Sequence, residues 1–314
     1  MEMRKKQAKG TISVIVTTYD HQGKFLPQSL QSVFSQTRKP VELIVVDDGS
    51  ADNTRQIIKK IDRKIKYIRH KKKLGGAAAF NTGLVTATGD YVIILPADDW
   101  FDSKILAEEA VILDSNPAIG VVYSQAIQVT NGKQELRVAQ PAGKKTVIGR
   151  FEFSRLLTQG DFVPLLTALF RRKIFGELGS VDANLSYFGD WEYWVRIAKH
   201  YPFAYIAKPL AYSRIHAASH SKTEGFRKAF KKEFGYILAK HLPDGEPTSP
   251  KIRAQAYNFY FSGLFGQSAV EGNLVKAFKF WWSSFLIKPL STSHLNAWRP
   301  FVVYFKRKFF LRAR

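Results

Sequence analysis

Apolar, β-branched runs alternate with segments of helical periodicity along the first part of the chain. Runs with the character of buried strands lie at residues 11–17, 41–46, 65–68, 91–95 and 119–129. Apolar residues recur at helical spacing between them, within residues 21–37, 51–62, 74–88 and 103–113. Because the strands are continuous apolar runs, we expect them to be buried on both faces. The alternation predicts an α/β fold with a mostly parallel sheet and helices on both of its faces.

The pattern changes along the rest of the chain. Residues 131–150 have weak periodicity and predict a flexible loop or hairpin, whereas 188–200 predict a helix with Trp191 and Trp194 in the core. Residues 206–224 are interpreted as a loop, and the segment after them is helical and basic. The predicted division of the chain is a basic disordered arm at 1–10, an α/β domain at 11–224, and a helical, basic, aromatic-rich extension at 225–314.

Two of the predicted strands end in pairs of acids. Asp47 and Asp48 follow the second strand, and Asp98 and Asp99 follow the strand at 91–95. The carboxyl ends of parallel strands meet at one sheet edge, where ligands bind in open α/β sheets. Four carboxylates at one edge repel each other unless a cation or a hydrogen-bonding ligand is present. A simpler interpretation is that these acids form turns and cap the helices that follow.

Composition limits the classes of chemistry that remain. The chain has 48 Lys and Arg against 26 Asp and Glu, a net charge of +22, so it attracts anions such as phosphorylated substrates or an anionic membrane. It has no cysteine, which excludes disulfides and thiolate metal sites. The apolar run after the basic N-terminus is too short for a signal peptide, and no run reaches the roughly 18 residues of a membrane span. We therefore expect a cytoplasmic protein.

Four ordered blocks of sequence carry a specific resemblance. They are ISVIVTTYD, VELIVVDDGSADNT, GGAAAFNTGLVTATGDYVIILPADDWF and FGDWEYWVRIA, and the stretch FVPLLTALFRRKIFGELGSVDANL lies between the third and fourth. Over residues 11–220 the chain resembles family 2 glycosyltransferases of the GT-A fold. The resemblance implies a Rossmann-like sheet and an inverting transfer of sugar from a nucleotide-sugar donor.

The resemblance also implies which residues bind the donor. Thr18 and Tyr19 would line the nucleotide pocket. Asp48, or its neighbour Asp47, would accept a hydrogen bond from the pyrimidine ring, and Asn81 would lie near the donor sugar and diphosphate.

A cation and a base complete the implied site. Asp98 would hold Mn²⁺ or Mg²⁺, with Asp99 beside it near the sugar hydroxyls and His216 approaching the metal. Such a cation neutralises the diphosphate leaving group. Asp190 would be the general base that takes the acceptor's proton, with Glu192 as a less favoured alternative.

The sequence departs from the family pattern at two positions. Pro96 stands where the family often has an acid that would complete an Asp-x-Asp triplet, and Phe80 stands where it often has Arg. A missing phosphate contact would be supplied by the lysines at 71–73 or by Arg214. The metal site would then depend on Asp98 and Asp99.

The C-terminal region is basic and aromatic. Residues 251–314 contain 11 Lys and Arg and a single acid, Glu271, with aromatics in FKFWWSSFLIKPL and FVVYFKRKFFLRAR. Basic and aromatic residues on an amphipathic helix indicate association with an anionic membrane surface. The alternative is a helical hairpin with a solvated basic face. No nucleic-acid-binding motif is present, and no nucleic-acid partner is expected.

The expected function is an inverting glycosyltransferase with a UDP-sugar donor and a polysaccharide or lipid-linked acceptor, with dTDP- and GDP-sugars as open alternatives for the donor. A nucleotidyltransferase would need a Gly-rich, basic signature after the first strand, which TTYDHQGKF lacks. A non-catalytic nucleotide-sugar-binding protein stays open because Pro96 removes an acid.

Overall fold

The computed structural model describes residues 9–20, 24–61, 64–130, 133–137, 146–150, 152–216, 219, 224–243, 250–270 and 273–287. These residues pack as two compact units. The first contains residues up to 153 together with 161–219, and the second contains 154–160 together with the chain from 220 onward. Most of the predicted arm at 1–10, the middle of the predicted loop at 138–145 and the chain after 287 lie outside the described residues.

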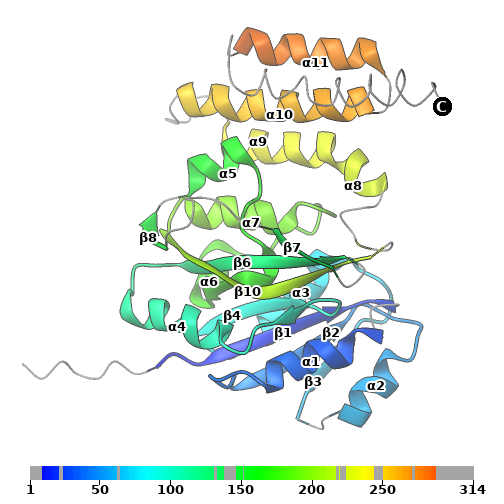
Figure 1. The fold of residues 1–314 in the computed structure, drawn as a ribbon, viewed down its shortest axis with the longest axis vertical. Helices are drawn as coiled ribbons and strands as arrows, with labels where there is room; N and C mark the ends of the chain where they lie inside the picture. Colours follow the sequence, from blue (N-terminus) through cyan, green and yellow to red (C-terminus); the bar gives the residue numbers. More distant parts are fainter. Residues whose placement is uncertain are drawn as a thin grey trace, which may run out of the picture. The chain divides into compact units, whose positions relative to one another are not determined.

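The first unit is built on one mixed sheet (Figure 1). Its strands are β1 (Ile12–Thr18), β2 (Glu42–Asp47), β3 (Lys66–Arg69), β4 (Tyr91–Pro96), β5 (Trp100–Phe101), β6 (Val121–Thr130), β7 (Lys133–Arg137), β8 (Val147–Arg150), β9 (Ala168–Arg171) and β10 (Phe203–Ile215). The order is β3-β2-β1-β4-β9-β6-β10-β5, with β7 beside β6 and β8 beside β10. Strands β3, β2, β1 and β4 are parallel, and so are β6 and β10, whereas β9 is antiparallel to both of its neighbours.

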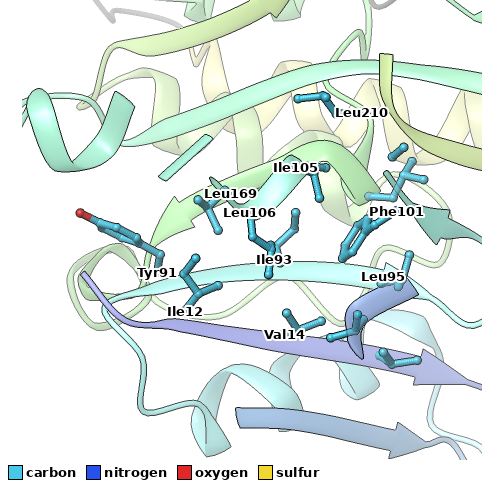
Figure 2. Packing of buried hydrophobic residues seen from close by; sticks show 14 of the residues in the cluster. Ile12, Val14, Tyr91, Ile93, Leu95, Phe101, Ile105, Leu106, Leu169 and Leu210 are labelled. Carbon is cyan, nitrogen blue, oxygen red and sulfur yellow. The ribbon is translucent and has the colours of Figure 1, made fainter. Parts of the chain in front are cut away.

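Helices cover both faces of this sheet. They are α1 (Leu26–Phe34), α2 (Thr54–Ile61), α3 (Gly76–Thr86), α4 (Ile105–Ser115), α6 (Lys173–Leu178) and α7 (Gly189–Ala198), together with the 3₁₀ turn η2 (Leu165–Thr167). Alternate residues of β1 and β4 pack with apolar residues of α1, α2 and α4, such as Leu30. Val14, Ile93 and Leu106 of this cluster are seen in Figure 2. Removal of this surface from water is the main force that holds the layers together.

The opposite face of the sheet packs against α3 and α7. Gly83 of α3 lies against β1 so closely that an added Cβ would be 2.4 Å from a methyl carbon of Ile15. Phe80, Phe170 and Tyr193 form an edge-to-face aromatic cluster with ring centroids 6.0–6.4 Å apart. Trp191 and Trp194 are buried, which confirms their prediction as core residues.

The largest error of the sequence-based prediction concerns residues 206–224. The part up to 215 is not a loop but the end of β10, which pairs along its length with β6. The register shifts at Ile206, Pro209 and Ala211, because proline cannot donate a ladder hydrogen bond and is accommodated by a bulge. That interruption hid the strand pattern. The hairpin alternative for 131–150 is borne out where β7 folds back on β6.

The second unit is helical. Its helices are α5 (Phe153–Gln159), α8 (Glu224–Ala229), the π-helical turn η4 (Phe230–Phe234), α9 (Gly235–His241), α10 (Pro250–Val270) and α11 (Leu274–Ile287). Phe265 of α10 and Ala277 of α11 form a small core with Phe280 and Trp281. Among the described helices, none is both long and apolar enough to cross a membrane. The predicted fold class, an α/β sheet with a helical extension, is confirmed.

Candidate functional site

The ends of β1, β2 and β4 lie side by side at one edge of the sheet. Thr18 pairs in register with Asp47, and Thr17 pairs with Pro96. The backbone N–H of Asp48 donates to the Thr18 carbonyl at 2.9 Å. Parallel pairing therefore brings both acid pairs to the same carboxyl edge, as the sequence pattern predicts.

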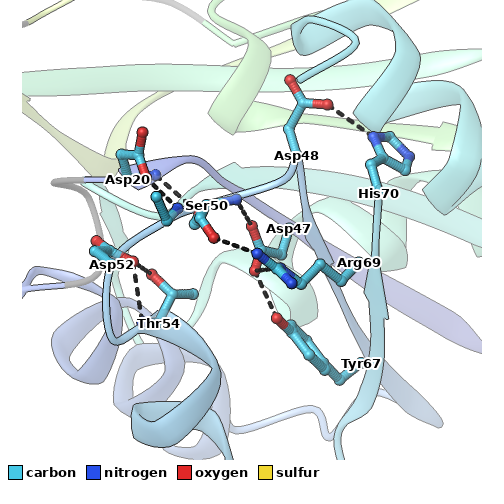
Figure 3. Close-up of polar contacts among 10 residues, drawn as sticks. Asp20, Asp47, Asp48, Ser50, Asp52, Thr54, Tyr67, Arg69 and His70 are labelled. Carbon is cyan, nitrogen blue, oxygen red and sulfur yellow. Dashed lines mark hydrogen bonds and ion pairs between the residues drawn. The ribbon is translucent and has the colours of Figure 1, made fainter. Parts of the chain in front are cut away.

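Asp47 holds the turn that follows β2 (Figure 3). Its side chain is fully buried, and its Oδ1 accepts the N–H of Ser50 at 2.8 Å. Oδ2 accepts the hydroxyl of Tyr67 at 2.5 Å and lies 3.5 Å from Nε of Arg69. The carboxylate is thus committed to protein partners, and its place in a ligand site stays a prediction.

Asp48 points away from Asp47, toward β3 and the start of α3 (Figure 3). Its Oδ1 lies 2.7 Å from Nδ1 of His70 and accepts the N–H of Leu74 at 2.8 Å, and its Oδ2 accepts the N–H of Gly75 at 2.7 Å. Because an ionised carboxylate only accepts hydrogen bonds, this contact places the proton of the imidazole on Nδ1. Nε2 of His70 then faces Oγ1 of Thr82 at 2.9 Å.

His70 was not among the residues predicted for the site. The sequence could have indicated His70 by its position directly after β3, the strand next to β2. The carboxyl ends of parallel strands lie at the same edge of a sheet, so a residue at this position is a candidate for the site. His70 links the ends of β2 and β3 to α3 and, together with the N–H groups of Leu74 and Gly75, orients the Asp48 carboxylate.

Thr18 and Tyr19 lie at the end of β1. The Thr18 hydroxyl is buried, and it has no hydrogen-bond partner within the described part of the chain. A buried hydroxyl without a partner costs free energy, so this group is suited to accept or donate a bond to a ligand. The Lys73 ammonium lies 4.0 Å from the centroid of the Tyr19 ring, a cation–π contact that brings positive charge to the predicted nucleotide pocket.

Asn81 has a structural partner. Its Nδ2 donates to the carbonyl of Val181 and its Oδ1 accepts the N–H of the same residue, both at 2.9 Å. This pair of bonds ties α3 to the segment that leads into α7. The predicted contact of Asn81 with the donor stays a prediction.

Asp98 and His216 form the part of the edge that is suited to a cation. Nε2 of His216 lies 3.1 Å from Oδ2 of Asp98, and both side chains are partly exposed. No group of three or more acidic or imidazole side chains in the described residues could hold a metal by itself. One carboxylate and one imidazole nevertheless fit a cation whose other ligands are diphosphate oxygens and water.

Asp99 differs from its neighbour. It is 7% exposed, and its Oδ1 accepts the backbone N–H of Arg214 at 2.7 Å. Burial raises the pKa of Asp99 well above its usual value, and the negative charge of Asp98 raises it further. The two carboxylates are therefore in distinct environments, one buried against β10 and one beside His216.

Arg214 is held by several contacts at the same edge. Its guanidinium lies between the rings of Phe25 and Trp100, at 4.5 and 4.8 Å from their centroids. Nη2 donates to Oε1 of Gln28 at 2.6 Å, and Nε donates to the carbonyl of Asp98 at 3.1 Å. The predicted diphosphate contact of Arg214 would come from a side chain already ordered by these contacts.

Asp190 lies in the first turn of α7. Its Oδ1 accepts the N–H of Trp191 at 2.8 Å. Burial raises the pKa of Asp190 to about 6, although the hydrogen bond from Trp191 opposes this shift. Glu192 is fully buried and lies 2.8 Å from Nη2 of Arg196, so its carboxylate is committed to an ion pair.

A mostly parallel sheet with acids at its carboxyl edge is the arrangement expected of a glycosyltransferase with a Rossmann-like sheet. A sequence model described as Glycosyl transferase family 2 matches residues 13–179. The chain belongs to glycosyl transferase family 2.

Known proteins agree with this class. An uncharacterized glycosyltransferase of Nostoc sp. is 29% identical over 66% of this chain and 66% of its own length. The crystal structure of S. aureus TarS 1-349 superposes with a TM-score of 0.64 at 20% identity, over 95% of this chain and 91% of that chain. A mannosyltransferase from Pyrobaculum calidifontis, PcManGT, superposes with a TM-score of 0.54 at 18% identity, over 96% of this chain and 88% of that chain. These structures share the fold with this chain.

Proposed function

We propose that this glycosyltransferase moves a sugar, with inversion, from a UDP-sugar to a polysaccharide or lipid-linked acceptor. The observation that carries the proposal is the contact between Asp98 and His216 at the sheet edge that also carries Thr18 and Asp48. Two solved neighbours support a nucleotide-sugar donor: TarS has been crystallised with UDP-GlcNAc, and PcManGT with GDP-Man and Mn²⁺. Of these two ligands, UDP-GlcNAc is the one that favours the UDP assignment.

In this proposal, different residues bind the base, the sugar and the diphosphate of the donor. Asp48, directed by His70, accepts a hydrogen bond from the base, while Thr18 and Tyr19 line the nucleotide pocket. Asn81 and Asp99 lie near the sugar, and Arg214 contacts the diphosphate. These assignments rest on the resemblance and on the positions of the side chains at the edge.

Asp98 and His216 would hold Mn²⁺ or Mg²⁺, which neutralises the charge of the departing diphosphate when it is bound. Asp190 takes the proton from the acceptor hydroxyl. A base with a pKa of about 6 is ionised at neutral pH and still strong enough to accept this proton as the new bond forms.

The place of action is proposed to be the inner face of the cell membrane, with peripheral attachment. A net charge of +22 supports this, because anionic lipid headgroups attract a basic protein.

Ligand binding tests the donor assignment. UDP and UDP-sugars with Mn²⁺ are expected to raise Tm, and GDP-Man to raise it less. At ~100 times Kd a ligand stabilises the folded state by about 2.7 kcal/mol, and each kcal/mol moves Tm by roughly 2–4 °C in a domain of this size. A larger shift with GDP-Man would contradict the UDP assignment. Binding of a UDP-sugar without any transfer would favour the non-catalytic alternative.

His70 is expected to affect the affinity for the nucleotide more than the chemical step. His70→Phe removes the side-chain donor to Asp48, which is one of the contacts that orient this carboxylate, so Kd for UDP should rise by roughly tenfold, or about 1.4 kcal/mol. His70→Asn, whose amide can replace Nδ1–H, should recover part of the affinity. Calorimetric titration with UDP measures both variants. An unchanged Kd in His70→Phe, with the fold intact by circular dichroism, would contradict this role.

A further inference from the structure

Helix α11 exposes a stripe of large apolar side chains. Val275, Phe278 and Trp282 are 83%, 60% and 47% exposed. Their spacing of three and four residues places them on one face of the helix. The other large exposed apolar residues of the described chain are far apart in sequence, at Val41, Leu74, Val85, Val111, Ile148 and Tyr236.

The opposite face of α11 is already used. Ala277 is buried against Phe265 of α10, and Phe280 and Trp281 pack on the same small core. This small core is thus made by side chains other than the three of the stripe. The rings of Phe278 and Trp282 stack with centroids 6.4 Å apart, which makes a continuous aromatic surface.

The side chains around the stripe are positively charged, which favours an anionic partner. Lys276 and Lys279 are exposed beside it, α11 contains no acid, and the sequence from 272 to 314 contains none either. A lysine can extend its ammonium toward headgroups while its carbon chain and the neighbouring aromatic rings enter the acyl boundary. Phe and Trp beside lysines form the pattern of a helix that lies in the plane of a membrane interface.

We infer that α11 is the surface by which this chain binds an anionic lipid bilayer, with Val275, Phe278 and Trp282 inserted at the interface and Lys276 and Lys279 at the headgroups. The inference rests on the proposed action at a membrane and assigns that contact to one helix face. It requires no part of the donor site, so binding to vesicles and binding of nucleotide can be tested separately.

The test is co-sedimentation of the full chain with vesicles of phosphatidylcholine alone or mixed with phosphatidylglycerol. The wild-type chain should bind the mixed vesicles and bind the neutral ones at least about tenfold more weakly, because each basic residue near an anionic surface adds to the attraction. The double variant Phe278→Ser with Trp282→Ser should lower the partition coefficient roughly tenfold or more, since burial of two aromatic side chains is lost. Lys276→Glu with Lys279→Glu should remove the preference for anionic vesicles.

Tyr236→Ser and Val111→Ser are the matched controls, because each replaces one exposed apolar side chain elsewhere in the chain. Both should bind vesicles like the wild type, and all variants should keep the wild-type Tm shift with UDP. Wild-type binding by the double aromatic variant overturns the inference, as does an equal loss in Tyr236→Ser. A chain that binds no vesicles but forms a dimer that the aromatic variant dissociates overturns it in favour of a protein contact. Vesicle binding without nucleotide binding would contradict the donor proposal alone.

Discussion

Asp190→Asn is expected to lower kcat by about 10²–10⁴-fold, the usual contribution of a general base. The substitution keeps the shape of the side chain but removes its ability to take a proton from the acceptor. Kd for the donor should stay within about twofold, because the proposed donor contacts come from other elements. Steady-state kinetics with the best UDP-sugar, together with calorimetric titration of UDP, separates the two effects.

The pH dependence follows from the raised pKa of Asp190. The ionised form is the active base, so kcat of the wild-type enzyme should rise with pH through about 6 and level off above it. A carboxyl whose folded-state pKa is raised contributes stability at low pH that is lost as pH rises through the folded pKa. At neutral pH the Asn variant should therefore be at least as stable as the wild type, and a measured Tm at or above the wild-type value would exclude unfolding as the cause of its lost activity.

Glu192→Gln provides the contrast. Glu192 is fully buried in an ion pair with Arg196, so its replacement should lower Tm more than it lowers kcat. Full activity in Asp190→Asn combined with a large loss of kcat in Glu192→Gln would show that the base is Glu192.

Much of the fold could be predicted because its strands are buried on both faces. Continuous apolar runs marked β1, β2 and β4, and their parallel arrangement followed from the helices between them. β10 escaped prediction because Pro209 and the bulge around it break the apolar pattern. The strand is also recognised mainly by its long pairing with β6, which is a contact between distant parts of the sequence.

The candidate site could be predicted only to the level of the sheet edge. Sequence order places Asp47 and Asp48 together after β2, but it cannot say that one carboxylate turns inward to Ser50 and Tyr67 while the other turns toward His70. Successive residues at a strand end point to different sides, and the partners available on each side decide which groups hold each carboxylate. The same reason separates Asp99, buried against β10, from Asp98 beside His216.

Asp98→Ala is expected to reduce sugar transfer by more than about 10²-fold, since loss of one preorganised group that stabilises developing charge costs ~10²–10³-fold. The carboxylate is the only anionic member of the Asp98–His216 pair, so Mn²⁺ affinity in the presence of UDP should fall with it. His216→Ala should lower the Mn²⁺ affinity less than Asp98→Ala does, because the carboxylate remains and hard cations prefer oxygen ligands. Titration of Mn²⁺ followed by electron paramagnetic resonance, with and without UDP, measures binding independently of turnover.

Asp102→Asn is the matched control for this position. Asp102 directly follows β5, four residues after Asp98 in the sequence. Its Oδ1 accepts the N–H of Lys104 at 2.9 Å, and the amide oxygen of an asparagine can accept the same hydrogen bond. Because nothing in the proposed chemistry involves Asp102, its variant should retain wild-type transfer and Mn²⁺ binding. If Asp98→Ala bound Mn²⁺ with UDP as tightly as Asp102→Asn does, the cation could not depend on this carboxylate. The pair with His216 would then be a contact of the fold, and the charge of the leaving diphosphate would have to be met by groups such as Arg214 and Lys73, which already lie at this edge.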